Sequence, residues 1–239
     1  FGQTAAAEEK AAEEVKPSHV EMVLVLDESG SMSNLTNDTI GGFNSMIEKE
    51  KKLDVDAHVT TVLFNDQYKM LYNRRELKDV RKMTDKDYTP GGMTALLDAV
   101  GRTIHKMDMV SGIHRKDKGN KVLFVIITDG EENDSREYTY ADVKKLIKDR
   151  QENAGWEFIF LGANIDAAAA AENLGIDRDR AVKYKNTGSG VRANFKAVAE
   201  LSDSLAKSGR VSDEWKETVE KDEDDAADKQ SAAVTLHRR

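Results

Sequence analysis

In the stretch VLVLDESGSMSNLT, residues 23–36, an apolar run stops at an acid and is followed at once by small polar residues. An apolar run without polar alternation is typical of a strand covered on both faces, as in a parallel sheet. The polar residues that follow have two interpretations. They form a turn that caps the next helix, or their oxygens line a cation site.

Short apolar runs and amphipathic segments alternate along the rest of the chain. This alternation predicts an α/β fold: a doubly wound, mostly parallel open sheet with helices on both faces. The predicted strands are 20–26, 57–64, 121–128, 156–161 and 181–185, and the predicted helices lie within 39–53, 94–107, 140–150 and 191–207. A further strand at 68–72 follows too closely on the strand ending at Phe64 for a crossover helix. It therefore predicts a hairpin and one antiparallel edge strand.

Composition bounds the organisation of the chain. With 239 residues, 39% of them hydrophobic and 33% charged, one domain with tails is expected. We predict an Ala/Glu-rich leader or linker at 1–17, a domain at 18–207 and an acidic C-terminal tail at 208–239. Within that tail, Val211, Trp215 and Val219 fall at helical spacing and predict one short helix.

Charge and cysteine content exclude several classes of function. The net charge of −8 argues against a nucleic-acid surface, and residues 212–230 carry nine acids against three lysines. No apolar stretch reaches the roughly 20 residues that span a bilayer, so no membrane association is expected. The absence of cysteine excludes disulfides and thiolate chemistry and favours a reducing, cytoplasmic location.

Oxygen donors gather in three loops. Asp27, Ser29 and Ser31 follow the first strand, Asp129 follows the central strand, and Thr94 opens a helix behind a Gly-Gly turn. In an open α/β sheet, ligands bind at the carboxyl ends of the strands. We therefore expect these five side chains to meet at one edge of the sheet.

The spacing of the first loop sets a geometric condition. Alternate residues on a straight strand lie about 6.6 Å apart, whereas two oxygens on one Mg²⁺ ion lie about 3 Å apart. Asp27, Ser29 and Ser31 can share an ion only if the chain curls after the strand, which the intervening glycine permits. Asp27 and Asp129 would neutralise a divalent cation. The remaining ligands are neutral, so the ion would gain from a carboxylate of another protein.

The Asp-x-Ser-x-Ser sequence at residues 27–31, Thr94 and the Thr-Asp-Gly sequence at 128–130 resemble the von Willebrand factor type A (vWA) domain over about residues 18–207. The resemblance implies a complete metal-ion-dependent adhesion site, in which Ser29, Ser31 and Thr94 bind the metal directly. Asp27 and Asp129 would contact it partly through water. It also implies Mg²⁺ (or Mn²⁺ or Ca²⁺) as the ion and an acidic residue of a protein partner. The chain resembles stand-alone bacterial members more than integrins or matrix proteins, and some of these bacterial members work with AAA+ ATPases.

Other interpretations fit less well. A magnesium-dependent phosphatase of the haloacid-dehalogenase type also places an acid like Asp27 after its first strand, but requires a second aspartate where this chain has Ser29. The five histidines show no metal-binding or triad spacing, which favours exposed or packing roles. Residues 188–193 match a relaxed dinucleotide fingerprint after the last strand and are interpreted as a helix-opening turn. No enzymatic activity is predicted.

Overall fold

Strands β1 (His19–Asp27) and β4 (Asn120–Thr128) run side by side in the computed structural model, which describes residues 18–114 and 120–221. Leu24 pairs with Val125, and both strands are buried along most of their length. The sheet has the order β3-β2-β1-β4-β5-β6, completed by β2 (Ala57–Phe64), β3 (Tyr68–Glu76), β5 (Glu157–Gly162) and β6 (Ala181–Lys183). All neighbours pair in parallel except β2 and β3, which confirms the predicted sheet and its antiparallel edge strand.

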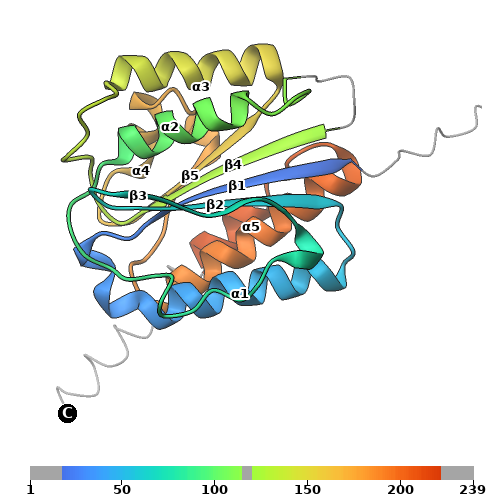
Figure 1. Ribbon diagram of the computed structural model, residues 1–239, viewed down its shortest axis with the longest axis horizontal. Coiled ribbons are helices and arrows are strands. Elements are labelled where there is room, and N and C mark those ends of the chain that lie inside the picture. Colours follow the sequence, from blue (N-terminus) through green and yellow to red (C-terminus); the bar gives the residue numbers. More distant parts are fainter. Residues whose placement is uncertain (1–17, 115–119, 222–239) are drawn as a thin grey trace, which may run out of the picture.

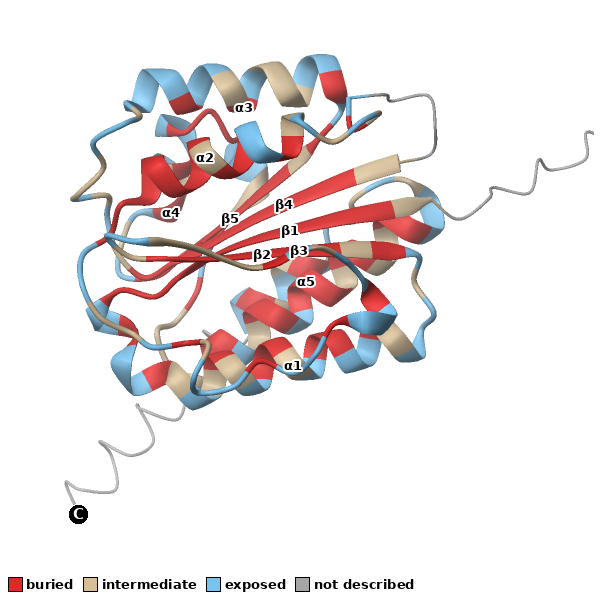
Figure 2. Cartoon of the chain, viewed as in Figure 1, coloured by how far each residue is buried: buried red, intermediate tan, exposed pale blue. Residues whose placement is uncertain are grey.

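Helices cover both faces of this sheet. On one face lie α1 (Thr36–Lys52) and α5 (Gly188–Ser208), and on the other lie α2 (Leu96–Asp108), α3 (Tyr140–Ala154) and α4 (Ala167–Asn173) (Figure 1). Each face has its own hydrophobic core, and Figure 2 shows the buried strands between helices whose outer sides are exposed. The doubly wound architecture is therefore confirmed.

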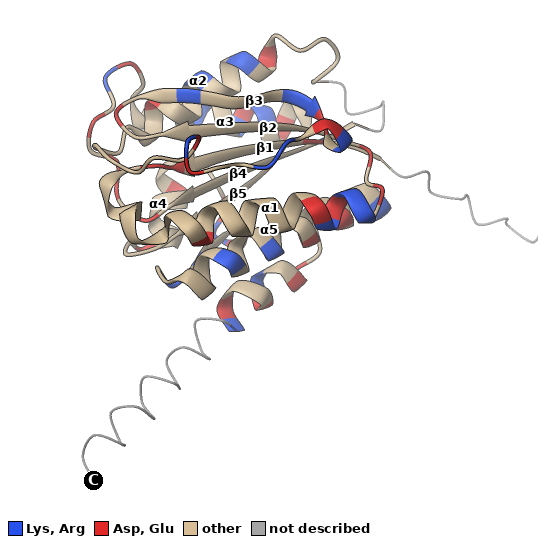
Figure 3. Ribbon diagram, turned by 60° about the horizontal axis from the view of Figure 1, so that its bottom comes forward, with Lys and Arg blue, Asp and Glu red and all other residues tan. Residues whose placement is uncertain are grey.

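Capping explains where several helices begin and end. At α3, the Thr139 hydroxyl accepts from the Asp142 amide, the Asp142 carboxylate accepts from the Thr139 amide, and Gly155 ends the helix at φ 69°. At α1, a 3₁₀ turn (Gly30–Leu35) precedes the helix, and no side chain caps it within the described chain. A cap from the polar residues after β1 is thus not formed. The basic residues in the last turn of α1 interact favourably with the helix dipole, and Figure 3 shows them beside acidic residues at that end.

The chain continues as ordered structure beyond α5. Residues 214–221 form a helix, and its Trp215 and Val219 are 0% and 1% exposed within the core on the α1/α5 face. The predicted leader at 1–17 and the part of the acidic tail at 222–239 lie outside the described residues. Every helix in the described part of the chain is too short or too polar to cross a membrane.

The order of the strands fixes where a ligand would bind. The connections from β1 and β4 lead to opposite sides of the sheet, so the strand order reverses between these two neighbours. In open α/β sheets the crevice at such a reversal, beyond the carboxyl ends of the strands, is the usual ligand site. Asp27 ends β1 and Asp129 directly follows β4, which places both acids at this position.

A buried carboxyl group lies between two helices on the α1/α5 face. Glu50 of α1 is 0% exposed, and neither of its carboxylate oxygens has a hydrogen-bond partner among the described residues. Burial raises the pKa of Glu50 from 4.5 to about 8. The group is therefore protonated in the folded chain at neutral pH, whereas it is ionised in the unfolded chain.

This difference predicts a stability that falls with rising pH. The contribution of Glu50 is complete below its ordinary pKa of 4.5 and is lost as the pH rises through about 8. The variant Glu50→Gln cannot ionise, so its free energy of unfolding is expected to fall less between pH 5 and pH 8.5. Urea unfolding of both proteins in EDTA, followed by circular dichroism, measures the difference. Parallel pH dependences for the two proteins would contradict the assignment.

Candidate metal site

The end of β1 is held by the carboxylate of Asp27, which is 2% exposed. Its Oδ1 accepts a hydrogen bond from the Ser29 amide at 2.7 Å, and its Oδ2 accepts one from the Thr128 hydroxyl at 2.7 Å. The chain enters the 3₁₀ turn at Gly30, so it curls immediately after the strand. Asp27 thus joins the β1 loop to the end of β4 and forms the base of the site.

The side chains of the first and central loops meet above that base. The Ser29 and Ser31 hydroxyl oxygens lie 3.1 Å apart, and the Ser31 hydroxyl donates to Oδ1 of Asp129 at 2.8 Å. Oxygen ligands on one Mg²⁺ ion lie about 3 Å apart. The Ser31 hydroxyl therefore lies about as far from the Ser29 hydroxyl and from the Asp129 carboxylate as two oxygens that share a cation lie from each other.

The third loop is attached to the other two through its backbone. Thr94, which is 5% exposed, receives a hydrogen bond at its carbonyl from the Asn133 amide at 3.0 Å. The Thr94 amide donates to the Asn133 side chain at 2.8 Å, and the Gly30 amide donates to the Gly92 carbonyl at 3.1 Å. Gly92 has φ 73°, a conformation that favours glycine, and a Cβ there would overlap the Asp66 carboxylate. These bonds hold the Thr94 loop against the loops that carry Ser29 and Asp129.

The electrostatics of the site favour a cation. Burial raises the pKa of Asp27 to about 6; hydrogen bonds from Ser29 and Thr128 oppose the rise, and the charge of Asp129 adds to it. Asp129 is itself only 2% exposed. Two buried carboxylates in contact with hydroxyl groups form an all-oxygen donor set, which suits a hard divalent cation. Such an ion would neutralise the repulsion between the two acids.

Sequence reasoning missed two asparagines that contact Asp129. Asn186 donates to Oδ2 of Asp129 at 3.2 Å, and its own Oδ1 is buried without a hydrogen-bond partner in the described chain. Asn164, at φ 57°, donates to the Asp129 carbonyl at 3.3 Å. Both residues lie beyond the carboxyl ends of strands, β6 and β5 respectively. That position is the signal by which the sequence could have indicated them.

Two acids near the site have structural roles that their sequence did not indicate. Glu28 is 5% exposed and accepts from the Thr89 amide at 2.9 Å, so it is not a solvated loop residue. Glu132 accepts from the Leu97 amide at 3.0 Å and from the Ser135 amide and hydroxyl at 2.6 and 2.7 Å. It thereby accepts a hydrogen bond from a backbone amide in the first turn of α2 that has no partner within the helix, directly behind Thr94.

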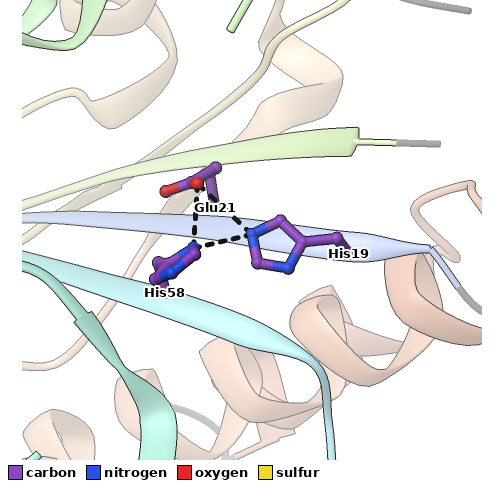
Figure 4. Close-up of side chains that lie close together, drawn as sticks. All are labelled: His19, Glu21 and His58. Carbon is purple, nitrogen blue, oxygen red and sulfur yellow. Dashed lines mark hydrogen bonds and ion pairs between the residues drawn. The ribbon is translucent and has the colours of Figure 1, made fainter. Parts of the chain in front are cut away.

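A second cluster of polar side chains lies at the amino end of the sheet. His19 and Glu21 of β1 face His58 of β2, and the three side chains point toward one another (Figure 4). The spacing of the histidines along the sequence did not indicate that His19 and His58 lie together. The pattern was invisible because the paired strands, not the sequence, bring these residues together.

Comparisons with known proteins agree with this architecture. The family model vWA-TerF-like, described as the vWA domain found in the TerF C terminus, matches residues 19–181. No curated protein sequence matches the chain significantly.

Three solved structures share the fold. The vWF domain of the type V pili tip protein Mfa5 from Porphyromonas gingivalis is 12% identical, with a TM-score of 0.55 over 82% of this chain and 99% of that one. The PilB minor pilin from Streptococcus sanguinis is 12% identical, with a TM-score of 0.56 over 77% and 61%. A von Willebrand factor type A protein from Catenulispora acidiphila is 15% identical, with a TM-score of 0.50 over 77% and 43%. The chain thus spans less than two thirds of the length of the PilB minor pilin and of the Catenulispora acidiphila protein.

Proposed function

We propose that this chain, which belongs to the vWA-TerF-like family, is a protein-binding module that holds a carboxylate of its partner through a divalent cation. The cation would be bound by Asp27, Ser29, Ser31, Thr94 and Asp129. One observation carries the proposal. Ser31 contacts both Ser29 and Asp129, at 3.1 and 2.8 Å, beside the buried carboxylate of Asp27.

Magnesium is the ion that we propose for this site. The donor atoms are hydroxyl and carboxylate oxygens, which bind Mg²⁺, Mn²⁺ or Ca²⁺ in preference to softer metals. The two loops already bring their oxygens to about the separation that the small Mg²⁺ ion requires, and Ca²⁺ would need a wider arrangement. In the proposed site, Ser29, Ser31 and Thr94 bind the ion directly. Asp27 contacts it partly through water and also orients the loop through its hydrogen bonds to Ser29 and Thr128.

The charge balance explains why a partner would complete the site. Two carboxylates against one divalent cation leave no excess negative charge, so the ion keeps a strong attraction for a further anionic ligand. Met93, beside Thr94, is 49% exposed, and Tyr140 is 44% exposed. Both side chains offer contact area for an apolar neighbour of the bound carboxylate. An aspartate or glutamate next to an apolar residue is therefore the partner chemistry that we propose.

A catalytic role is not proposed. The phosphatase alternative requires a general acid two residues after Asp27, and there the chain has the Ser29 hydroxyl, which contacts Ser31 instead. A hydroxyl group cannot supply a proton to a leaving group as a carboxylic acid does. The partner class suggested by family resemblance is an AAA+ ATPase.

Metal-dependent capture tests the proposal. The full chain, immobilised in MgCl₂, should retain a partner that is released by EDTA, and the variant Asp129→Ala should not retain it. The affinity of the purified partner should fall at least about 100-fold in EDTA, as expected when a charged contact at the centre of an interface is lost. Replacing the acidic residue of the partner by its amide should have the same effect. An affinity that is unchanged in EDTA would contradict the proposal.

A further inference from the structure

The cluster at the amino end of β1 lies far from the proposed magnesium site. His19 and Asp27 are the first and last residues of β1, and the eight steps between them span about 26 Å. His19 and Glu21 project from the same face of the strand, two residues apart, and the parallel register places Glu21 opposite His58 of β2. Strand pairing alone therefore assembles two imidazoles and one carboxylate.

The three potential ligand atoms are close to one another. Nε2 of His19 lies 2.9 Å from Nδ1 of His58, and Oε1 of Glu21 lies 3.2 Å from the first nitrogen and 3.1 Å from the second (Figure 4). Around a tetrahedral Zn²⁺ ion with bonds of about 2.0–2.1 Å, ligand atoms lie about 3.3 Å apart. Small side-chain movements would thus open the triangle enough to accept the ion.

The surroundings of the cluster orient it for metal binding. The outer nitrogen of His19, Nδ1, lies 3.0 Å from the Asp56 carboxylate, the kind of partner that orients a metal-binding histidine. Nε of Arg74 donates to Oε2 of Glu21 at 3.2 Å, and Oε1, which Arg74 also contacts, faces the two histidines. The Glu21 side chain is 3% exposed, whereas His19 and His58 are 18% and 27% exposed, so an ion can enter from solvent.

We propose that His19, Glu21 and His58 form a second metal site, which takes Zn²⁺ and leaves its fourth position to water. Two imidazoles and a carboxylate are a donor set for zinc rather than magnesium, in contrast to the all-oxygen loops at the other end of β1. Zinc bound there would link β1 to β2 at the amino edge of the sheet. It would stabilise the folded chain by an amount that grows with the logarithm of the zinc concentration divided by the Kd.

Arg74 competes with a metal ion for the Glu21 carboxylate. Its Nη2 also bonds Oε1 of Glu21 and lies 3.4 Å from Nδ1 of His58, so its positive charge lies next to the proposed ion. This contact must be released when the ion binds. Removing the competing charge in Arg74→Gln is therefore expected to tighten zinc binding. A network of hydrogen bonds and ion pairs alone would bind no zinc in either protein.

The test is a zinc titration of the full, tag-free chain in excess MgCl₂, read by competition with a chromophoric chelator. One equivalent of Zn²⁺ should bind, and His58→Ala should weaken it by at least about 100-fold, since even outer-shell changes lower metal affinity 10–100-fold. His114→Ala is the matched control, because His114 also lies near an acid, 3.3 Å from Asp108, but outside the cluster. It should leave the affinity unchanged.

A second measurement does not depend on the variants folding. In the wild-type chain, stoichiometric Zn²⁺ should shift the imidazole NMR signals of His19 and His58 and leave those of His105 and His114 in place. Equal zinc affinity in His58→Ala and wild type would overturn the proposal. So would the absence of stoichiometric binding to the wild-type chain, which would leave the cluster as a network of hydrogen bonds and ion pairs.

Discussion

Replacing Trp215 by alanine is expected to lower the free energy of unfolding by about 3–5 kcal/mol, the range for truncating a large buried aromatic side chain. The Trp215 side chain is 0% exposed and belongs to the core on the α1/α5 face, together with Val219 one turn later. Its indole nitrogen has no hydrogen-bond partner in the described chain. The decrease in the free energy of unfolding would therefore come from lost packing. It would show that residues after 207 stabilise the domain.

Equilibrium urea unfolding in EDTA measures this effect, and the neighbouring exposed residue provides the control. Glu214→Ala changes the same helix at an exposed position, so its effect should stay within about 0.5 kcal/mol. If Trp215→Ala and Glu214→Ala had equal effects, residues 214–221 would contribute nothing to the fold.

The variant Asp129→Ala is expected to raise the Kd for Mg²⁺ at least about 100-fold, equivalent to about 2.8 kcal/mol of binding free energy. It removes one of two anionic groups of the proposed site and the acceptor of the Ser31 hydrogen bond. It also removes a charge that raises the pKa of Asp27. The metal-free variant should therefore unfold at no lower temperature than the metal-free wild type, although it no longer binds metal.

Isothermal titration with MgCl₂ separates coordination from a general effect of charge. Glu131→Ala removes the same charge from the same loop, but Glu131 is exposed, where solvent and salt screen its field. Its Kd should remain close to that of the wild type. Equal weakening in Glu131→Ala and Asp129→Ala would mean that Asp129 acts only through its charge.

The features predicted from the sequence are those encoded by local patterns. Unbroken apolar runs identified β1 and β4 as central parallel strands, and the short gap after Phe64 identified the β2–β3 hairpin. The loops converge because carboxyl ends of adjacent parallel strands share one edge. The direct contact between Ser31 and Asp129 follows from this rule and the curl at Gly30.

The features missed depend on contacts between segments or on very short elements. α4 is seven residues long and mostly alanine, so it shows no apolar stripe. The His19 and His58 contact depends on the β1–β2 register, which no pattern within one strand reveals. The role of Glu132 was not indicated, because the Leu97 amide from which it accepts lies 35 residues earlier in the chain. For the histidines and Glu132, the deciding interaction joins residues that lie far apart in the sequence.

The location of a bound ion tests whether the three loops form one metal site. Crystals of the full chain grown with MnCl₂ can be measured at a wavelength where manganese gives an anomalous signal. An anomalous peak is expected about 2.2 Å from the Ser29 and Ser31 hydroxyl oxygens, with the Asp27 and Asp129 carboxylates around it. Asp129→Ala crystals should lack this peak. Full-occupancy manganese elsewhere, with no density between Ser29 and Asp129, would contradict the proposed metal site.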